Sequence, residues 1–377
     1  GNFNMAGGAI GQSAYETDRD FTRALGTGAG DVQLTGGGGG GGGSVGFSAY
    51  GAPIDINFGG SGATVVWGSP TFNPGIFTLN GGSATHVATL VNDLDLGGEQ
   101  RYIRLDGGSS AGNRAVMGTI SGDITNGGIV KRGGGVLFFD GAQSYTDSTI
   151  IHEGELWLRN GTGTAGANVI GNDIMIGAAS RLKIDAPSSI GSRQSIIMQN
   201  QDDNSASAIA FGPGYGNGSD ILFHSIISAN GSSIPQTGAY DITLANQQRG
   251  NDRRNRVAVQ LSGNHVFTTD VMAQIKAVAP DVQAWLGADT GNGTYAGSTI
   301  PATGRDKTGG VEAFRLGSGG GTLTIANENV LDGAFPLIVG AEDQTGRTNI
   351  GGVVFLPKAQ NYSGIISQTD GTPLDAG

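Results

Sequence analysis

The chain has 377 residues, of which 71 are glycine, and it contains no cysteine. Only 11 residues are proline, which excludes a collagen-like triple helix. No apolar stretch reaches about 18 residues, which excludes a chain of transmembrane helices. The glycine content argues against a helical bundle. The net charge of −11 predicts no nucleic-acid partner and no membrane insertion, and the lack of cysteine excludes disulfides, thiolate metal sites and thiol nucleophiles.

Short apolar runs bounded by Gly, Asn, Asp or Ser recur along the chain, and such runs are typical of strands in an all-β fold. In chain order they are Pro53–Phe58, Ala63–Trp67, Tyr102–Leu105, Val136–Phe139, Leu156–Leu158, Asp173–Ile176, Leu182–Ile184, Ser195–Met198, Ile221–Ile227, Tyr240–Leu244, Val257–Leu261, Leu337–Val339 and Val353–Leu356. Asn-Gly steps such as Asn80-Gly81 and Asn126-Gly127 separate them, and both residue types tolerate the positive φ of tight turns.

A five-residue pattern, Gly-x-apolar-x-apolar, recurs within these runs. It occurs at Gly75–Leu79, Gly135–Phe139, Gly154–Leu158, Gly321–Ile325 and Gly352–Leu356, with a serine variant at Ser180–Ile184. Alternate residues of a strand face one side, so each unit offers two inward side chains that it cannot bury alone. Stacking such units on one another buries them, which predicts a solenoid.

A longer repeat spans residues 134–146 and 351–363. The two segments align without gaps and share Gly-Gly, Val, Phe138/Phe355, Ala-Gln and Tyr145/Tyr362. This length exceeds one strand and predicts a superrepeat of several strands.

One segment has helical spacing. Between Asp270 and Leu286 the apolar residues recur at intervals of four and three, which predicts a helix near 270–286 within an insertion over 268–288. Thr269 is a candidate N-cap and Gly287 a candidate C-terminal residue, while Pro280 predicts a kink or two short helices. We expect this helix to decorate a β scaffold. The stretch Tyr15–Leu25 is compatible with either helix or strand.

Several polar and glycine-rich features were considered as sites of chemistry. They are the glycine run Gly36–Gly43, the histidines His86, His152, His224 and His265, the carboxylate pairs Asp93/Asp95 and Asp202/Asp203, and the arginines Arg249, Arg253, Arg254 and Arg256. The glycine run lacks the Lys-Ser/Thr ending of a phosphate loop, and no two histidines have metal-ligand spacing. We therefore predict no catalytic, cofactor-binding or metal-binding residue, with calcium at a carboxylate pair and an anion patch at the arginines kept as alternatives.

The run Gly127–Thr146, followed by Glu153–Leu158, resembles the autotransporter-associated β-strand repeat. That repeat reads Gly-Leu-x-Lys-x-Gly-x-Gly-x-Leu-x-Leu-x-Gly-x-Asn-x-Tyr-x-Gly and then Gly-x-Leu. In this chain Lys131 and Tyr145 match the Lys and the Tyr of the repeat. Gln143 replaces its Asn, and Asp147 stands near the last Gly of its first part. The resemblance implies a right-handed parallel β-helix exported to a bacterial surface, and it brings no catalytic residues.

Together these features predict a single β-helical solenoid over residues 1–377, either part of a longer chain or stacking on itself. The expected function is that of a secreted structural protein, a rod, fibre or sheath subunit whose partners are other copies or further rungs. One alternative is a glycan-binding adhesin or tailspike-like module with an exposed aromatic groove around Trp67, Tyr102 or Trp157. Another is a β-helical polysaccharide lyase or hydrolase, which needs acids and arginines converging on one face.

Overall fold

The computed structural model describes residues 1–12, 20–36, 43–60, 62–106, 116–159, 173–177, 180–185, 194–199, 207–212, 223–228, 233–235, 240–245, 256–261, 266–280, 282–289, 291–304, 312–340, 352–364 and 366–368. The chain forms two compact units. Unit 1 contains Gly1–Ile174 and Ser188–Gly191, and unit 2 contains Met175–Pro187 and Ser192–Gly377.

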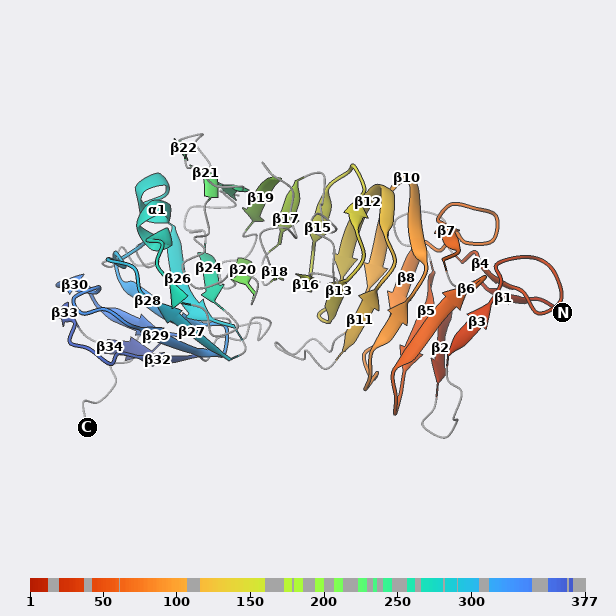
Figure 1. The fold of residues 1–377 in the computed structure, drawn as a ribbon, viewed down its shortest axis with the longest axis horizontal. Helices are drawn as coiled ribbons and strands as arrows, with labels where there is room; N and C mark the ends of the chain where they lie inside the picture. Colours follow the sequence, from red (N-terminus) through yellow and green to blue (C-terminus); the bar gives the residue numbers. More distant parts are fainter. Residues whose placement is uncertain are drawn as a thin grey trace. The chain divides into compact units, whose positions relative to one another are not determined.

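In unit 1, consecutive segments of the chain return to the same ladders of parallel strands (Figure 1). The first ladder contains β2 (Gly8–Gln12), β5 (Ser44–Ala49), β8 (Ile76–Leu79), β10 (Asp93–Arg104), β12 (Ile124–Arg132) and β15 (Thr149–Ile151). The second contains β3 (Phe21–Arg23), β6 (Ile54–Phe58), β9 (Ala88–Leu90), β11 (Met117–Ile120), β13 (Val136–Phe139) and β16 (Gly154–Leu158). Shorter pairings join β1 (Phe3–Met5) to β4 (Val32–Leu34), β7 (Thr64–Val66) to β10, and β14 (Gln143–Ser144) to β12. β17 (Ile174–Ile176) crosses the boundary between the units.

Unit 2 repeats this arrangement. Its longest ladder contains β18 (Ser180–Ile184), β20 (Ser207–Phe211), β24 (Arg256–Leu261), β26 (Gln283–Ala288), β28 (Phe314–Ser318), β31 (Leu337–Val339) and β34 (Ile366–Gln368). A second ladder contains β25 (Val266–Phe267), β27 (Asn292–Tyr295), β29 (Thr322–Ile325) and β32 (Val353–Phe355), and β30 (Asp332–Gly333) pairs with β33 (Asn361–Tyr362). A further set contains β19 (Gln194–Gln199), β23 (Tyr240–Ala245), β21 (Phe223–Ser228) and β22 (Ser233–Pro235), and β22 runs antiparallel to β21.

The all-β class predicted from the sequence is confirmed, and the sheets are parallel apart from the pairing of β21 with β22. Each of the thirteen predicted apolar runs contains a strand. The units of the five-residue pattern stack as expected: Val136 in β13 pairs with Glu155 in β16, and Thr322 in β29 pairs with Val353 in β32. Within the ambiguous stretch Tyr15–Leu25, Phe21–Arg23 forms a strand, while residues 13–19 lie outside the described residues.

Asn-Gly steps bend the chain at and within strands. Asn80, directly after β8, and Asn126, inside β12, are each the first residue of such a step and have φ values of 80° and 56°. The Asn80 side chain is fully buried: its Oδ1 accepts from Ala49 N at 2.7 Å and its Nδ2 donates to His86 O at 2.7 Å. The turn residue therefore also satisfies backbone groups of neighbouring segments, which limits the cost of burying them.

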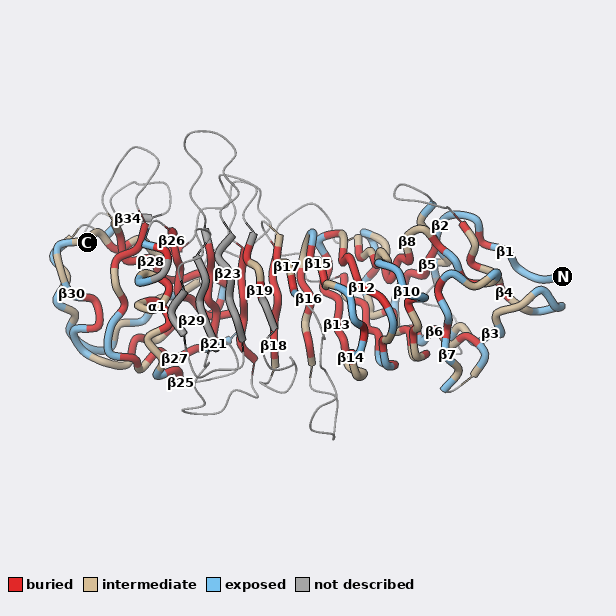
Figure 2. Tube along the Cα trace, turned by 90° about the horizontal axis from the view of Figure 1, so that it is seen from above, coloured by how far each residue is buried: buried red, intermediate tan, exposed pale blue. Residues whose placement is uncertain are grey.

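The interior of unit 1 is apolar and rich in aromatic rings. Phe47, Phe58, Phe72, Phe77 and Trp67 are each at most 2% exposed and form a chain of ring contacts with centroids 5.4–6.4 Å apart. Figure 2 shows buried positions repeating along the stacked strands of both units. Rings at these separations add attraction to the burial of apolar area.

The helix α1 (Val271–Val278) corrects two expectations. Its N-cap is Asp270 rather than Thr269, and it ends before Pro280, after which residues 283–288 form β26 between β24 and β28. The helical spacing misled there because β26 is buried on both faces, and a doubly buried strand is apolar without alternation. Among the described residues α1 is the one helix, and none is long and apolar enough to cross a membrane.

Nor is α1 a decoration. Val271 and Met272 are fully buried and Ile275 is 3% exposed, so the helix belongs to the core. Asp270 binds it to a neighbouring turn by accepting from Tyr295 Oη and Ser298 N, both at 2.7 Å. Burial tends to raise the pKa of Asp270, but the hydrogen bonds it receives outweigh burial and hold that pKa below its ordinary value.

Candidate functional site

The carboxylates of Asp93 and Asp95 accept hydrogen bonds from nearby groups of unit 1. Asp93 Oδ1 accepts from Asp123 N at 2.9 Å, and Asp95 Oδ1 accepts from Gly97 N at 2.8 Å and Asn126 Nδ2 at 3.0 Å. Asp202 and Asp203 lie outside the described residues. Among the residues that the structure describes, no three His, Asp or Glu side chains gather in a way that could hold a metal ion.

The other polar candidates are not brought together in the described part of the chain. His86 forms a hydrogen bond with its neighbour Thr85, and His152 is exposed after β15. His224 lies in β21 and Arg256 in β24, and the structure does not describe their side chains. His265, Arg249, Arg253 and Arg254 lie outside the described residues.

The glycine run is described only at its ends. A side chain on Gly36 would overlap the backbone of Ala6, and one on Gly43 would come within 3.1 Å of Ala6 O. Because Gly36 and Gly43 have no side chain, the backbone at Ala6 can pack directly against them. Residues 37–42 lie outside the described residues.

Of the three aromatic residues that are candidates for a glycan groove, one is buried and two are partly exposed. Trp67 is 1% exposed and donates from Nε1 to Pro74 O at 2.9 Å. Trp157 packs on Phe138 with ring centroids 5.2 Å apart. Tyr102 is half-exposed, and the Arg132 guanidinium lies 4.5 Å from its ring centroid. Tyr102 and Trp157 are both partly exposed, and Tyr102 is the one that lies beside a hollow among the described residues.

Tyr102 belongs to an ordered patch on the surface of unit 1, which we call the outer face. Its members alternate with the buried Ile103, Ile129 and Ile151, so they point to the opposite side of the ladder. They are Gln100, Tyr102 and Arg104 on β10, Gly128, Val130 and Arg132 on β12, and Ser148, Ile150 and His152 in and beside β15.

The strand register arranges the outer face in three rows. Gln100 lies opposite Gly128, Tyr102 opposite Val130, and Arg104 opposite Arg132, while Val130 also lies opposite Ile150. One row is polar, the middle row is apolar with one aromatic ring, and the third is basic. In the middle row Val130 is only 5% exposed, so Tyr102 and Ile150 supply its accessible surface. Arg104 forms an ion pair with Asp106, which neutralises part of the basic row.

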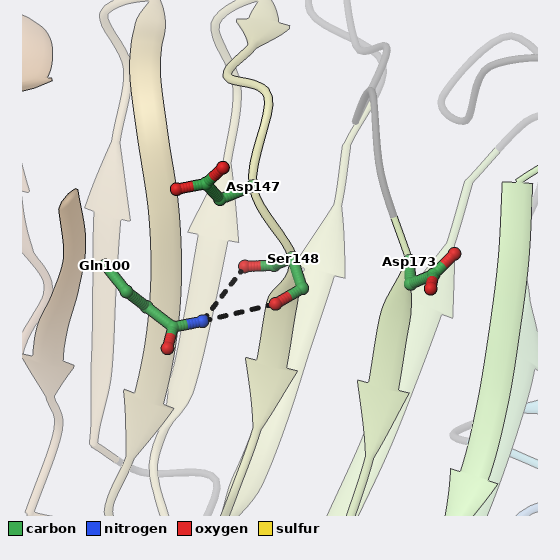
Figure 3. A pocket seen from close by; sticks show the side chains of 4 residues that line it. All are labelled: Gln100, Asp147, Ser148 and Asp173. Carbon is green, nitrogen blue, oxygen red and sulfur yellow. Dashed lines mark hydrogen bonds between the residues drawn. The ribbon is translucent and has the colours of Figure 1, made fainter. Parts of the chain in front are cut away.

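A shallow open hollow of about 360 Å³ lies at the polar row (Figure 3). It is lined by Gln100, Asp147, Ser148 and Asp173, and Gln100 Nε2 donates across Gly128 to Ser148 Oγ at 3.3 Å. A Cβ on Gly128 would lie 2.7 Å from Ser148 O, so glycine allows Ser148 to approach β12 closely at this position. Amide, hydroxyl and carboxylate groups of this kind suit a ligand that carries hydroxyls.

The strands at the ends of the ladders form two further candidate surfaces. β1, β2 and β3 each stand at the end of their ladder in unit 1, and β32, β33 and β34 do so in unit 2. We call these sets the N-terminal edge and the C-terminal edge. Each presents unpaired backbone groups within the described residues, which is the usual template for adding another strand.

The superrepeat is visible in the side-chain contacts as well as in the sequence. Gln143 Nε2 donates to Gly141 O at 2.9 Å, and Gln360 Nε2 donates to Lys358 O at 3.3 Å, two residues earlier in both copies. The copies occupy different ladders, because β13 lies in the second ladder of unit 1 and β32 in the four-stranded ladder of unit 2.

Comparison of the chain with models of known protein families, with curated proteins and with solved structures finds no match. The candidate sites therefore rest on geometry. Sequence reasoning named Tyr102 but missed the outer face, because its rows combine residues 20 to 28 positions apart along the chain. The alternation of Gln100, Tyr102 and Arg104 was the one signal that could have indicated it.

Proposed function

We propose that this chain is a structural protein, a right-handed parallel β-helix that serves as a rod, fibre or sheath subunit on a bacterial surface and does not catalyse a reaction. One observation carries the proposal: consecutive segments return to the same parallel ladders in each unit. Connections between parallel strands of one sheet are right-handed in about 98% of cases, which supports the handedness. The resemblance of Gly127–Leu158 to an autotransporter repeat supports the exported location.

In this proposal the work of the protein is mechanical. Every strand inside a ladder is hydrogen-bonded on both sides, and the inward Leu, Ile, Val and Phe side chains form a continuous apolar interior. Bending such a ladder would break backbone hydrogen bonds and at the same time separate packed apolar side chains. The ladder is therefore stiff because its strands are paired and packed on one another.

The proposal is tested by imaging and by a search for activity on the same purified chain. We expect electron microscopy to show rods, and we expect no soluble product from a panel of acidic polysaccharides, with or without added Ca²⁺. Release of oligosaccharides would replace the structural function with that of a lyase or hydrolase. Globular particles would contradict the β-helix.

A second candidate function, glycan binding, is favoured by the outer face. Its half-exposed Tyr102 stands between a polar row with a hollow and a basic row, and sugars combine apolar ring faces with hydroxyl edges in the same way. Glycan-array and calorimetric titrations test it with Tyr102→Ala, using Tyr50→Ala as the matched control. Binding that only Tyr102→Ala abolishes supports an adhesin, and the absence of binding in the wild type removes this candidate.

A further inference from the structure

Exposed large hydrophobic side chains concentrate on the edge strands. Five such residues occur among those described, and four of them lie on the edges: Phe3 on β1, Val353 and Phe355 on β32, and Ile366 on β34. Their exposed fractions are 45%, 60%, 55% and 38%. The fifth, Val66, is 44% exposed and lies on β7. The edges therefore combine unpaired backbone groups with apolar surface, the two properties of a strand-docking surface.

The two copies of the superrepeat differ in how far their matched phenylalanines, Phe138 and Phe355, are covered. Phe138, in the first copy, is 6% exposed because Trp157 of the following strand packs on it and the Arg159 guanidinium lies 4.0 Å from its ring centroid. Phe355 holds the matched position in the second copy and is 55% exposed. Within the described residues, β29 is the one strand that pairs with β32, and the other side of β32 carries no paired strand.

The N-terminal edge also has an apolar side chain that is not fully covered. Phe3 and Met5 lie opposite Val32 and Leu34, which are fully buried, so both point into the interior of unit 1. Met5 is buried, but Phe3 remains 45% exposed because β1 has no strand on its other side in the described residues. An inward-facing aromatic ring is thus left half in water.

We propose that the C-terminal edge of one copy binds the N-terminal edge of a second copy, with β32 pairing in parallel with β1. The inference rests on the proposed structural function, and it means that copies assemble head to tail. In this register Phe3 lies over Val354, Asn4 over Phe355 and Met5 over Leu356, because Val354 and Leu356 continue the inward positions of Leu323 and Ile325.

A second copy fits these edges for reasons of geometry. Both edges consist of three strands in chain order, and the free side of β1 points away from β4 while that of β32 points away from β29. In this pairing, β1 and β4 of the second copy extend the ladder of β25, β27, β29 and β32. The contact joins two different surfaces, so each copy can bind a further copy at its other edge, and repetition produces a ring or an open fibre.

The absence of cysteine makes a direct test available. Neighbouring strands lie about 4.8 Å apart, within the Cα separation that a disulfide spans. We expect the double variant Asn4→Cys/Phe355→Cys to form a ladder of disulfide-linked oligomers on oxidation. The control Asn4→Cys/Asp55→Cys, which pairs Asn4 with an exposed residue of β6, should give no ladder. Equal ladders from both variants would overturn the proposed register.

The unlinked protein gives an independent measurement. We expect sedimentation velocity to show concentration-dependent oligomers, and Phe3→Asp to weaken the association at least tenfold. Val66→Asp introduces the same charge at the same exposure away from the edges and should leave association unchanged. A wild-type chain that stays monomeric at all concentrations, or variants that weaken association equally, would overturn the inference. Monomeric rods without polysaccharide cleavage would refute only this inference and leave the structural function standing.

Discussion

The Lys131 ammonium occupies the space that a Cβ on residue 154 would need, and residue 154 is a glycine. Lys131 is fully buried and donates to three backbone carbonyls, Gly133 O, Gly135 O at 2.6 Å and Glu153 O at 2.7 Å. The lysine therefore joins the turn before β13 to the start of β16. In the resemblance to the autotransporter repeat, Lys131 and Gly154 stand at two of the matching positions, and the structure gives a physical reason for their pairing.

Gly154→Ala should destabilise unit 1 more than the backbone alone explains. Gly154 has a φ of 73°, and an added Cβ would also lie 2.6 Å from Gly135 O and displace Lys131. Gly30 has a φ of 91° with nothing within 4 Å of its added Cβ, so Gly30→Ala isolates the backbone term of about 1 kcal/mol. We expect thermal unfolding to show a loss at least twice as large for Gly154→Ala. Equal losses would mean that Lys131 moves aside freely.

Lys131 should make stability depend on pH. Burial lowers its pKa from 10.5 to about 7, with Glu155, Glu153 and Asp106 opposing the shift. Between pH 7 and 10.5 the unfolded chain holds the proton and the folded chain does not, so the contribution of Lys131 to the free energy of unfolding rises with pH across this window. The wild type should therefore gain stability relative to Lys131→Met as pH rises. The exposed Lys358→Met is the control, and a constant difference between wild type and Lys131→Met would contradict the prediction.

Asn92→Ala should cost about 2–4 kcal/mol. The Asn92 amide is fully buried, accepts from Phe58 N at 2.6 Å and donates to Phe58 O and Ala63 O, both at 2.9 Å. Alanine leaves three buried backbone groups without this partner. The exposed Asn361 donates to Asp332 at 2.7 Å, and Asn361→Ala should cost far less. Denaturant unfolding compares the two variants, and similar losses would show that water replaces the Asn92 amide.

Asp289→Asn should destabilise unit 2 by about 3–5 kcal/mol. Asp289 is 1% exposed and binds Arg181 Nη1 at 2.5 Å and Lys183 Nζ at 2.8 Å, so removing its charge takes a buried anion away from two buried cations. Asp332→Asn, at an exposed aspartate, is the matched control. Hydrogen exchange on β18 and β26 reports the effect locally, and unchanged protection there would contradict it.

Local chemistry made the strands predictable. Val136–Phe139 and Leu337–Val339 were predicted as strands with the bounds that the structure shows, because short apolar runs between glycines have few alternatives. The same reasoning failed for residues 283–288, where the spacing of Val282 and Trp285 suggested a helix. Trp285 is 3% exposed and β26 is covered on both faces, and burial on both faces is a tertiary property that no spacing within the segment encodes.

The sequence by itself determined the all-β class, the stacking units and the turn chemistry, because each follows from the φ preferences of Gly and Asn and from the side-chain period of a strand. Only the tertiary structure decided which polar residues meet. Arg181 and Asp289 are 108 positions apart yet form one buried ion pair, and Gln100 reaches Ser148 across a glycine of the intervening strand. Such contacts depend on the register and on the length of every loop between the strands, which local preferences do not fix.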